Sequence, residues 1–229
     1  MTVLRFDAVL FDCDGVLVDS EPITARVLAA MLGELGWPLT PEDALRIFVG
    51  KTVSDEAPLI QARTGYAITP DWLDQFRARR NRELETDVQA IDGAPQAVRA
   101  LHQLLDGRIA VASGADFPKI ELQLRKIGLY EYFVGRYFSG QALANNKPAP
   151  DVYRAAAQAL GVDPQRCAVI EDTVTGATAG VAAGATVFGY SPGGPGHDST
   201  QALLQAGVAH VFHDMHDLPG LLAAEHAAA

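Results

Sequence analysis

The sequence predicts an α/β protein, with a doubly wound, parallel, Rossmann-like sheet and a small all-α domain inserted after the first strand. From Ile91 onward, short apolar runs alternate with helical patterns, and short connections of this kind are typical of right-handed crossovers between parallel strands. Residues from about Glu21 to Val88 contain helical patterns and no convincing strand. With 229 residues and 48% apolar content, the chain can bury a full core and support a second domain.

The first strand is predicted at Ala8 to Phe11, because strands covered on both faces of a parallel sheet are apolar almost throughout. Asp12 and Asp14 follow this run directly, and Gly15 then lets the chain turn. Open α/β sheets bind ligands at the carboxyl ends of their strands. The two acids therefore favour a functional site over a solvated turn.

The helical segment is expected to form a domain of residues 18–89, whereas residues 1–17 and 90–229 form the core. Thr40 lies between Pro38 and Pro41 at the turn between the first two helices, where it is predicted to cap the second helix. Thr69 is predicted to open a later helix in the same way. Helical patterns in this segment cover Ile23–Leu35, Ser54–Arg63 and Asp71–Leu84.

The core continues with the predicted alternation of strands and helices. Further strands are predicted at Ile109–Ala112, Tyr137–Ser139, Cys167–Ile170, Thr186–Gly189 and His210–Phe212. Helices are predicted at Ala94–Leu105, Pro118–Ile127, Asp151–Leu160 and Gly176–Ala183. The Ala-rich end, Leu221–Ala229, is predicted to be a frayed helix end.

Polar residues that could take part in binding or catalysis follow two more of these strands. Ser113-Gly114 comes after one strand and Glu171-Asp172 after another. Lys147 lies between them, next to two prolines at the start of a predicted helix, and Thr173 is predicted to cap the next helix. Because the strands are parallel, these groups should meet Asp12 and Asp14 at one edge of the sheet.

Composition narrows the class of protein. The formal net charge of −10 argues against nucleic-acid binding, which rewards a clustered basic surface. No apolar run reaches the length of a membrane span, and no secretory leader is recognisable, so a cytoplasmic protein with no membrane association is expected. Cys13 and Cys167 are expected to be reduced. An acidic protein that binds a phosphate needs local positive charge from a metal, a lysine or backbone N–H groups.

Taken together, these motifs resemble those of the haloacid dehalogenase superfamily of phosphohydrolases. The resemblance covers nearly the whole chain, through four ordered elements: Asp12-Cys13-Asp14-Gly15, Ser113-Gly114, Lys147-Pro148 and Glu171-Asp172. The helical insertion resembles the cap of the branch that contains β-phosphoglucomutase-like enzymes and small sugar-phosphate phosphatases. Within that branch, the pattern most resembles bacterial phosphatases of the phosphogluconate phosphatase type.

The resemblance implies a role for each strand-end residue. Asp12 would attack phosphorus and form an aspartyl phosphate, and Asp14 would protonate the leaving oxygen and then deprotonate water. Crowding by Asp12, Glu171 and Asp172 is expected to keep a proton on Asp14 near neutral pH. Mg²⁺ would bind Asp12, the Asp14 carbonyl and Asp172, with Glu171 bound directly or through water. Lys147, Ser113 and the amides of Gly114 and Ala115 would balance the phosphoryl charge.

Substrate selection is expected to depend on the inserted domain. Gly50 and Lys51 belong to a loop similar to the family's glycine-containing cap loop. Glu21 is placed either to meet substrate hydroxyls or only to occupy the first turn of the opening helix of the cap. Lys51 is as consistent with a solvated side chain as with a ligand for a substrate anion. Arg77 and Arg80 share one face of a basic helix, so one or two of the arginines there could point into the crevice, although a solvated face is favoured. The cap is expected to move about hinges near residues 16–20 and 87–93.

The sequence thus predicts a Mg²⁺-dependent phosphatase for a small phosphorylated metabolite, with a sugar or sugar-acid phosphate preferred. A sugar-phosphate mutase is the alternative, although Val53 stands where mutase-like relatives commonly have an arginine. A catalytically inactive binding or regulatory protein is the alternative from another class. Asp14 argues against a dehalogenase or a phosphonate hydrolase. A monomer or weak homodimer is expected.

Overall fold

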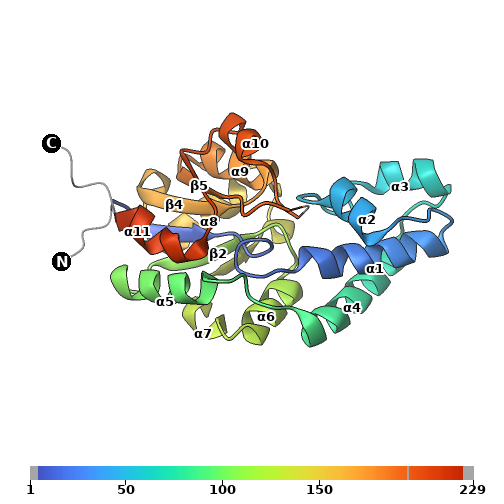
Figure 1. Cartoon of the computed structure of the whole chain (residues 1–229), viewed down its shortest axis with the longest axis horizontal. Helices are drawn as coiled ribbons and strands as arrows, with labels where there is room; N and C mark the ends of the chain where they lie inside the picture. The colour runs from blue at the N-terminus through green and yellow to red at the C-terminus, as the bar shows by residue number, and fades with distance from the viewer. Residues whose placement is uncertain (1–4, 195, 224–229) are drawn as a thin grey trace.

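The computed structural model describes residues 5–194 and 196–223, which form a sheet flanked by helices and a separate group of helices at one end (Figure 1). The sheet is six-stranded, with the order β3-β2-β1-β4-β5-β6, and every neighbouring pair is parallel. The strands are β1 Ala8–Phe11, β2 Ile109–Ser113, β3 Tyr137–Ser139, β4 Cys167–Glu171, β5 Thr186–Tyr190 and β6 His210–Phe212. The predicted doubly wound parallel fold is confirmed.

Strand β1 lies at the point where the chain reverses its direction across the sheet. The chain passes from β1 outward to β2 and β3, and later returns to β4 on the other side of β1. In the register of these strands, Phe11 pairs with Val111 of β2 and Ile170 of β4. Asp12, which follows β1, therefore lies between the polar ends of β2 and β4, where doubly wound sheets bind their ligands.

Helices cover both faces of the sheet, and the side chains of β1 alternate between the two apolar cores. Val9 and Phe11 pack on one face and Ala8 and Leu10 on the other, as the pleat of a strand requires. The first face is covered by α5 Ala94–Leu104, α6 Phe117–Lys126, α7 Tyr130–Phe133 and α11 Leu218–Ala223. The second is covered by α8 Asp151–Ala159, α9 Val174–Ala183 and α10 Thr200–Gln205.

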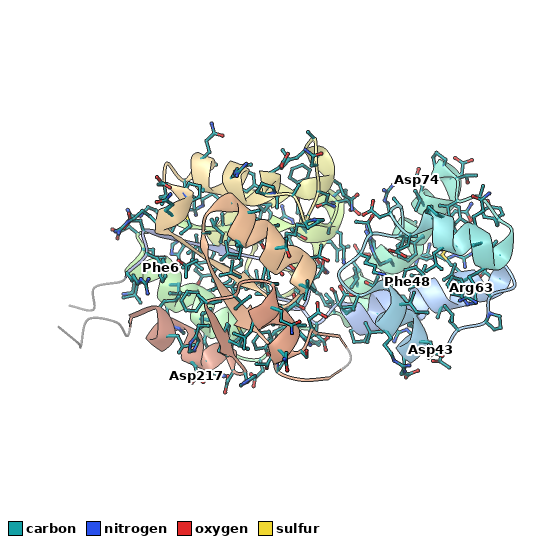
Figure 2. All side chains as sticks on the ribbon, turned by 90° about the horizontal axis from the view of Figure 1, so that it is seen from above. Phe6, Asp43, Phe48, Arg63, Asp74 and Asp217 are labelled. Carbon is teal, nitrogen blue, oxygen red and sulfur yellow. The ribbon has the colours of Figure 1, made fainter. Side chains whose placement is uncertain are left out.

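The helices between β1 and α5 have an apolar core of their own. Leu28, Leu45, Ile60 and Trp72 contribute to this cluster, which is distinct from the two clusters of the sheet. The four helices are α1 Glu21–Glu34, α2 Pro41–Phe48, α3 Ala57–Thr64 and α4 Pro70–Asp87. Figure 2 shows this group of helices, marked by Phe48 and other labelled residues, beside the larger body that contains the sheet.

Capping residues explain where several helices begin. The hydroxyl oxygen of Thr40 accepts a hydrogen bond from the Asp43 amide at 3.1 Å and caps α2, as predicted. Thr69 and Thr173 cap α4 and α9 in the same way, also as predicted. Helix α3 begins at Ala57, three residues later than expected, because Thr52 accepts the Asp55 amide in a turn before it.

Two helices, α7 and α10, were not predicted, because four and six residues are too few to show a helical period. The predicted frayed end at Leu221–Ala229 lies mostly outside the described residues, since the description of α11 ends at Ala223. Within the described part of the chain, none of the helices has the length and apolar character needed to cross a membrane.

Candidate active site

Three buried carboxylates meet at the carboxyl edge of the sheet. Asp12 follows β1, while Glu171 ends β4 and Asp172 follows it. Each offers an oxygen within 4.8 Å of those of the other two, and all three side chains are buried. The parallel pairing of strands, which was predicted from sequence, is the reason why these residues, distant in the chain, lie together.

Lys147 is the cation of this cluster. Its Nζ lies 2.8 Å from Asp12 Oδ1 and 2.6 Å from Glu171 Oε1. Tyr153 of α8 donates its hydroxyl to the same Glu171 oxygen at 2.5 Å. Burial alone would lower the pKa of Lys147, but the charges of Asp12 and Glu171 raise it well above its ordinary value. Lys147 is therefore charged throughout the physiological pH range.

The single positive charge of Lys147 does not neutralise three carboxylates that are all buried from solvent. Burial raises the pKa of Asp12 to about 7, with Lys147 opposing the rise and Glu171 and Asp14 adding to it. Burial, followed by repulsion from Glu171 and Asp12, raises the pKa of Asp172 well above its ordinary value. Asp172 Oδ1 is buried with no hydrogen-bond partner among the described residues. An unsatisfied oxygen beside two other carboxylates suits a hard divalent cation, which takes oxygen ligands.

Gly15 leaves room for the Asp172 carboxylate because it has no side chain. Its φ of +76° is the left-handed conformation that favours glycine, and a Cβ at this position would overlap the Asp172 carboxylate. His197 is also nearby, with its Nε2 3.1 Å from the Gly15 carbonyl and 3.9 Å from Asp172 Oδ2. His197 was not predicted, because it lies in the loop after β5, far from any strand-end motif.

Asp14 has surroundings that the sequence reasoning did not anticipate. Its Oδ1 accepts hydrogen bonds from Lys119 Nζ at 2.7 Å, from Gln123 Nε2 at 2.8 Å and from the Ser20 hydroxyl. Burial alone would raise the pKa of Asp14, but the Lys119 charge, with these donors, lowers it to about 2. The prediction that crowding keeps Asp14 protonated near neutral pH is therefore wrong.

Lys119 and Gln123, the two residues missed by that prediction, lie on α6. They are four residues apart, which places both on one face of a helix that follows the Ser113 loop directly. Both side chains are buried, at 5% and 0% exposure. The sequence signal available was the four-residue spacing of a lysine and a glutamine on the helix that follows the Ser113 motif, but the sequence does not show that this face is buried against Asp14.

The Ser113-Gly114-Ala115 loop is held from several sides. The Ser113 hydroxyl oxygen accepts the Ala115 amide at 3.0 Å. Ser139 donates to the Ala115 carbonyl at 2.6 Å, and Asn146 donates to the Gly114 carbonyl at 3.1 Å. These hydrogen bonds fix the loop, and the Ser113 hydroxyl hydrogen is not needed for the Ala115 contact.

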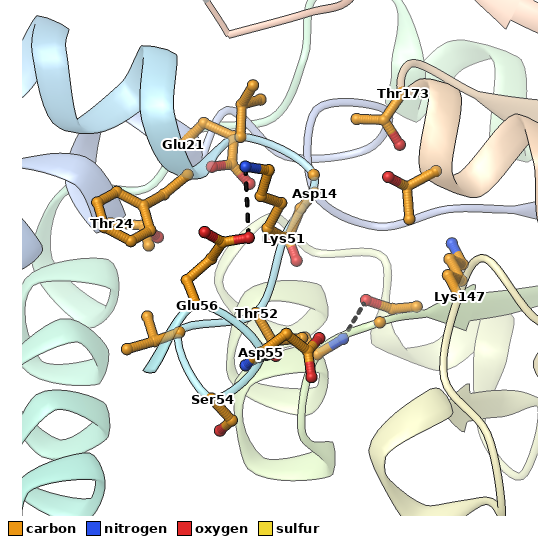
Figure 3. A pocket seen from close by; sticks show the side chains of 18 of the residues that line it. Asp14, Glu21, Thr24, Lys51, Thr52, Ser54, Asp55, Glu56, Lys147 and Thr173 are labelled. Carbon is orange, nitrogen blue, oxygen red and sulfur yellow. Dashed lines mark hydrogen bonds and ion pairs between the residues drawn. The ribbon is translucent and has the colours of Figure 1, made fainter. Parts of the chain in front are cut away.

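A cavity of about 320 Å³ opens where this edge of the sheet faces the helical group. Figure 3 shows Lys51 and Glu56 on one side of it and Lys147 and Thr173 on the other. All but one of the predicted site residues line it: Asp12, Asp14, Glu21, Gly50, Lys51, Ser113, Gly114, Ala115, Lys147 and Asp172. Glu171 is the exception, and it lies fully buried behind Lys147.

The cavity wall formed by the helical group carries both acids and cations. Burial raises the pKa of Glu21 to about 7, with the Lys119 charge opposing this rise. Lys51 is half-exposed and lies 3.3 Å from Glu56, so its cation has a carboxylate neighbour. Gly50, with a φ of +70°, packs beside Thr173 at the start of α9 and brings this loop close to the sheet.

The basic face of α4 is not wholly solvated, and the expectation is wrong for Arg80. Arg80 is 6% exposed, and its Nη2 lies 2.9 Å from Asp116, which caps α6. Arg77 lines the cavity beside it and bonds Asp74 at 3.0 Å, whereas Arg79 pairs with the exposed Glu34. Asp116 explains the difference, because it gives the buried guanidinium a partner on the sheet side.

Comparisons with known proteins agree with this geometry. The sequence model of a hydrolase family described as haloacid dehalogenase-like hydrolase matches residues 6–184. The 6-phosphogluconate phosphatase of Escherichia coli is 32% identical over 185 residues, which cover 80% of this chain and 82% of that protein. Hexitol phosphatase A of Escherichia coli is 31% identical over 189 residues, covering 81% of this chain and 83% of that protein.

Solved structures show the same likeness over almost the whole chain. A haloacid dehalogenase-like protein of unknown function from Agrobacterium tumefaciens superposes with a TM-score of 0.81 at 33% identity, covering 96% of this chain and 98% of that one. A haloacid dehalogenase family hydrolase from Deinococcus radiodurans, with bound phosphate and sodium, gives 0.73 at 38% identity, covering 96% and 99%.

Proposed function

This chain belongs to the haloacid dehalogenase-like hydrolases, and from that premise we propose that it is a Mg²⁺-dependent phosphatase acting on a sugar or sugar-acid phosphate through an aspartyl phosphate. The observation that carries the proposal is the group of Asp12, Glu171 and Asp172, with Lys147 in contact, at the floor of a cavity. These are a nucleophile, a set of oxygen ligands and a fixed cation, which phosphoryl transfer requires.

The substrate class is supported by the relatives and by the cavity. The relatives named above act on 6-phosphogluconate and on hexitol phosphates, by their names. The cavity of this chain is lined by acids and cations from both sides, among them Glu21, Lys51 and Arg77. Such a lining suits a small polar molecule with hydroxyl groups, since each buried polar group needs a partner.

We propose that Mg²⁺ is held by Asp12 and Asp172, with the Asp14 backbone carbonyl and with Glu171 bound directly or through water. The unpartnered Asp172 Oδ1 and the raised pKa of Asp172 are the observations that support this assignment. When bound, the ion supplies the positive charge that offsets repulsion between the carboxylates and a phosphoryl dianion.

In the first step, a carboxylate oxygen of Asp12 attacks phosphorus in line as the bond from phosphorus to the leaving oxygen breaks. Lys147 neutralises charge on Asp12 and the transferring group, and the Ser113 hydroxyl and Gly114 amide hold phosphoryl oxygens. The Ala115 amide, expected to join them, donates its hydrogen bond to Ser113 Oγ. It therefore acts first as a support for Ser113.

Asp14 exchanges a proton in both steps. Entry of a phosphoryl dianion raises its pKa, because like charges disfavour the ionised form, and protonated Asp14 then gives its proton to the leaving oxygen. In the second step, ionised Asp14 accepts a proton from water as the water oxygen attacks phosphorus. The bond between phosphorus and Asp12 breaks, and the carboxylate of Asp12 is restored with release of phosphate.

We further propose that residues 18–89 act as a cap on a core of residues 1–17 and 90–229. The distinct apolar cluster of the helical group and the cavity at its border support this division. Hinges near residues 16–20 and 87–93 would let the cap close over the substrate and exclude water other than the attacking molecule.

The test is phosphate release from a panel of sugar and sugar-acid phosphates, with and without Mg²⁺, by the wild-type protein and Asp12→Asn. Asp71→Asn, an exposed acid on α4, is the matched control. We expect Mg²⁺-dependent release that favours sugar or sugar-acid phosphates and is lost only in Asp12→Asn. Release unchanged in Asp12→Asn would overturn the mechanism, and faster isomerisation than release would favour the mutase.

A further inference from the structure

One oxygen of Asp14 is fixed while the other stays available. Oδ1 receives the three donors from Lys119, Gln123 and Ser20. The buried polar atoms without a partner among the described residues are Thr24 Oγ1 and Asp172 Oδ1. Asp14 Oδ2 receives none of the three donors and is not among these atoms, and the Asp14 side chain, which is 15% exposed, lines the cavity.

The Gln123 amide has only one orientation that satisfies both of its ends. Its Nε2 donates to Asp14 Oδ1 at 2.8 Å, and its Oε1 lies 3.5 Å from Cys13 Sγ, which donates to it. A reversed amide would place its oxygen against the Asp14 carboxylate. Because Gln123 is fully buried, an unmade hydrogen bond here would leave a polar group unsatisfied and destabilise the reversed orientation. The residue therefore links two consecutive residues of the Asp12–Asp14 segment to α6.

Helix α6 connects this contact to the phosphoryl-binding loop. It begins immediately after the Ser113-Gly114-Ala115 loop and is capped by Asp116, which accepts the Lys119 amide at 3.0 Å. The same helix thus sets the place of the loop at its start and of Asp14 along its buried face. A rigid element that holds both groups fixes the distance between them.

We propose that Gln123 is a positioning residue: it holds Asp14 Oδ1 so that Oδ2 faces the leaving oxygen of the substrate. The inference rests on the acid and base roles proposed for Asp14 above. Gln123 does not contact the reacting atoms and carries no charge, so its effect passes through the orientation of Asp14. Its loss should therefore matter most where a poor leaving group needs a proton.

The experiment measures kcat/KM, which reports the first step, for a series of aryl phosphates from p-nitrophenyl phosphate to phenyl phosphate, with Mg²⁺. Gln123→Met removes both hydrogen bonds at similar volume, and Gln165→Met, an exposed glutamine, is the matched control. General acid catalysis contributes about 10²–10⁴-fold, so we expect Gln123→Met to lose roughly tenfold or more on phenyl phosphate and less than about threefold on p-nitrophenyl phosphate. Equal losses along the series would overturn the proposal.

A double-mutant cycle separates positioning from a general weakening of the fold. In an Asp14→Asn background no acid remains to be oriented, so adding Gln123→Met should leave kcat/KM for phenyl phosphate unchanged within about twofold. A further loss as large as in the wild-type background would refute the role. Gln123→Glu, which places an acceptor against Asp14, repeats the test if the Met variant is misfolded. Persistence of activity in Asp12→Asn would instead reject the proposed function itself.

Discussion

Replacing Lys147 with methionine tests whether the carboxylate cluster depends on its internal cation. Lys147 contacts Asp12 and Glu171 at 2.8 and 2.6 Å, and its side chain is only 7% exposed. Removing one partner of a buried ion pair costs about 3–5 kcal/mol, because the remaining charge is left uncompensated. For a chain of this size, each kcal/mol lowers Tm by about 2–4 °C, so without metal at pH 8 we expect a loss of roughly 6–20 °C.

The fall in Tm caused by Lys147→Met should depend on pH, because the charge of Asp12 does. The folded-state pKa of Asp12, about 7, lies above the ordinary value of 3.8. Its contribution to stability is therefore full below pH 3.8 and is lost as pH rises through about 7. At pH 5 Asp12 is protonated with or without Lys147, so the loss in Lys147→Met should be clearly smaller than at pH 8.

The assay is thermal unfolding followed by circular dichroism with a chelator present, at both pH values. Lys126→Met, an exposed lysine on α6, is the control and should shift Tm by less than about 2 °C, as surface substitutions usually do. A shift below 2 °C in Lys147→Met, or the same shift at pH 5 and pH 8, would refute the reasoning.

Two more substitutions probe the packing of the site. Gly15→Ala should displace the Asp172 carboxylate and lower the Mg²⁺ affinity measured by calorimetry. Gly33→Ala, which has open space on the exposed side of α1, should leave that affinity unchanged. Equal Mg²⁺ affinities in the two variants would argue against a metal role for Asp172. Arg80→Met should destabilise the protein by about 1.5–3 kcal/mol in urea unfolding, because it removes the 2.9 Å charged hydrogen bond to the partly buried Asp116 and leaves that carboxylate only Arg77, at 3.9 Å, as an ion-pair partner. Arg79→Met breaks an exposed ion pair and should lower the free energy of unfolding by no more than about 1 kcal/mol. A similar loss in Arg80→Met would show that burial does not strengthen the Arg80–Asp116 ion pair.

The fold and the acidic edge could be predicted because their signals are local. Apolar runs such as Ala8 to Phe11 predict buried strands, and parallel pairing then brings the residues that follow each strand to one edge. Asp12, Lys147 and Asp172 were placed by this reasoning, and the structure brings them together. The resemblance to the haloacid dehalogenase superfamily depended on the same strand-end residues, and the family is confirmed.

The protonation of Asp14 could not be predicted from its neighbours in sequence. Its pKa depends on Lys119 and Gln123, which approach from a helix more than a hundred residues away in the chain. The sequence places other acids beside Asp14 but does not show which buried cation faces it. Arg80 was misjudged for a similar reason, since its partner Asp116 lies on a different part of the fold.

Covalent phosphorylation of Asp12 is the most direct test of the proposed mechanism. Asp14→Asn lacks the base for the second step, while p-nitrophenyl phosphate has a leaving group that needs little protonation in the first. Rapid mixing of this variant with p-nitrophenyl phosphate and Mg²⁺, followed by acid quenching and peptide mass spectrometry, should find a phosphoryl group on the peptide containing Asp12. No such peptide should form when a chelator replaces Mg²⁺. A phosphoryl group on another residue, or steady phosphate release without any phosphopeptide, would contradict the account.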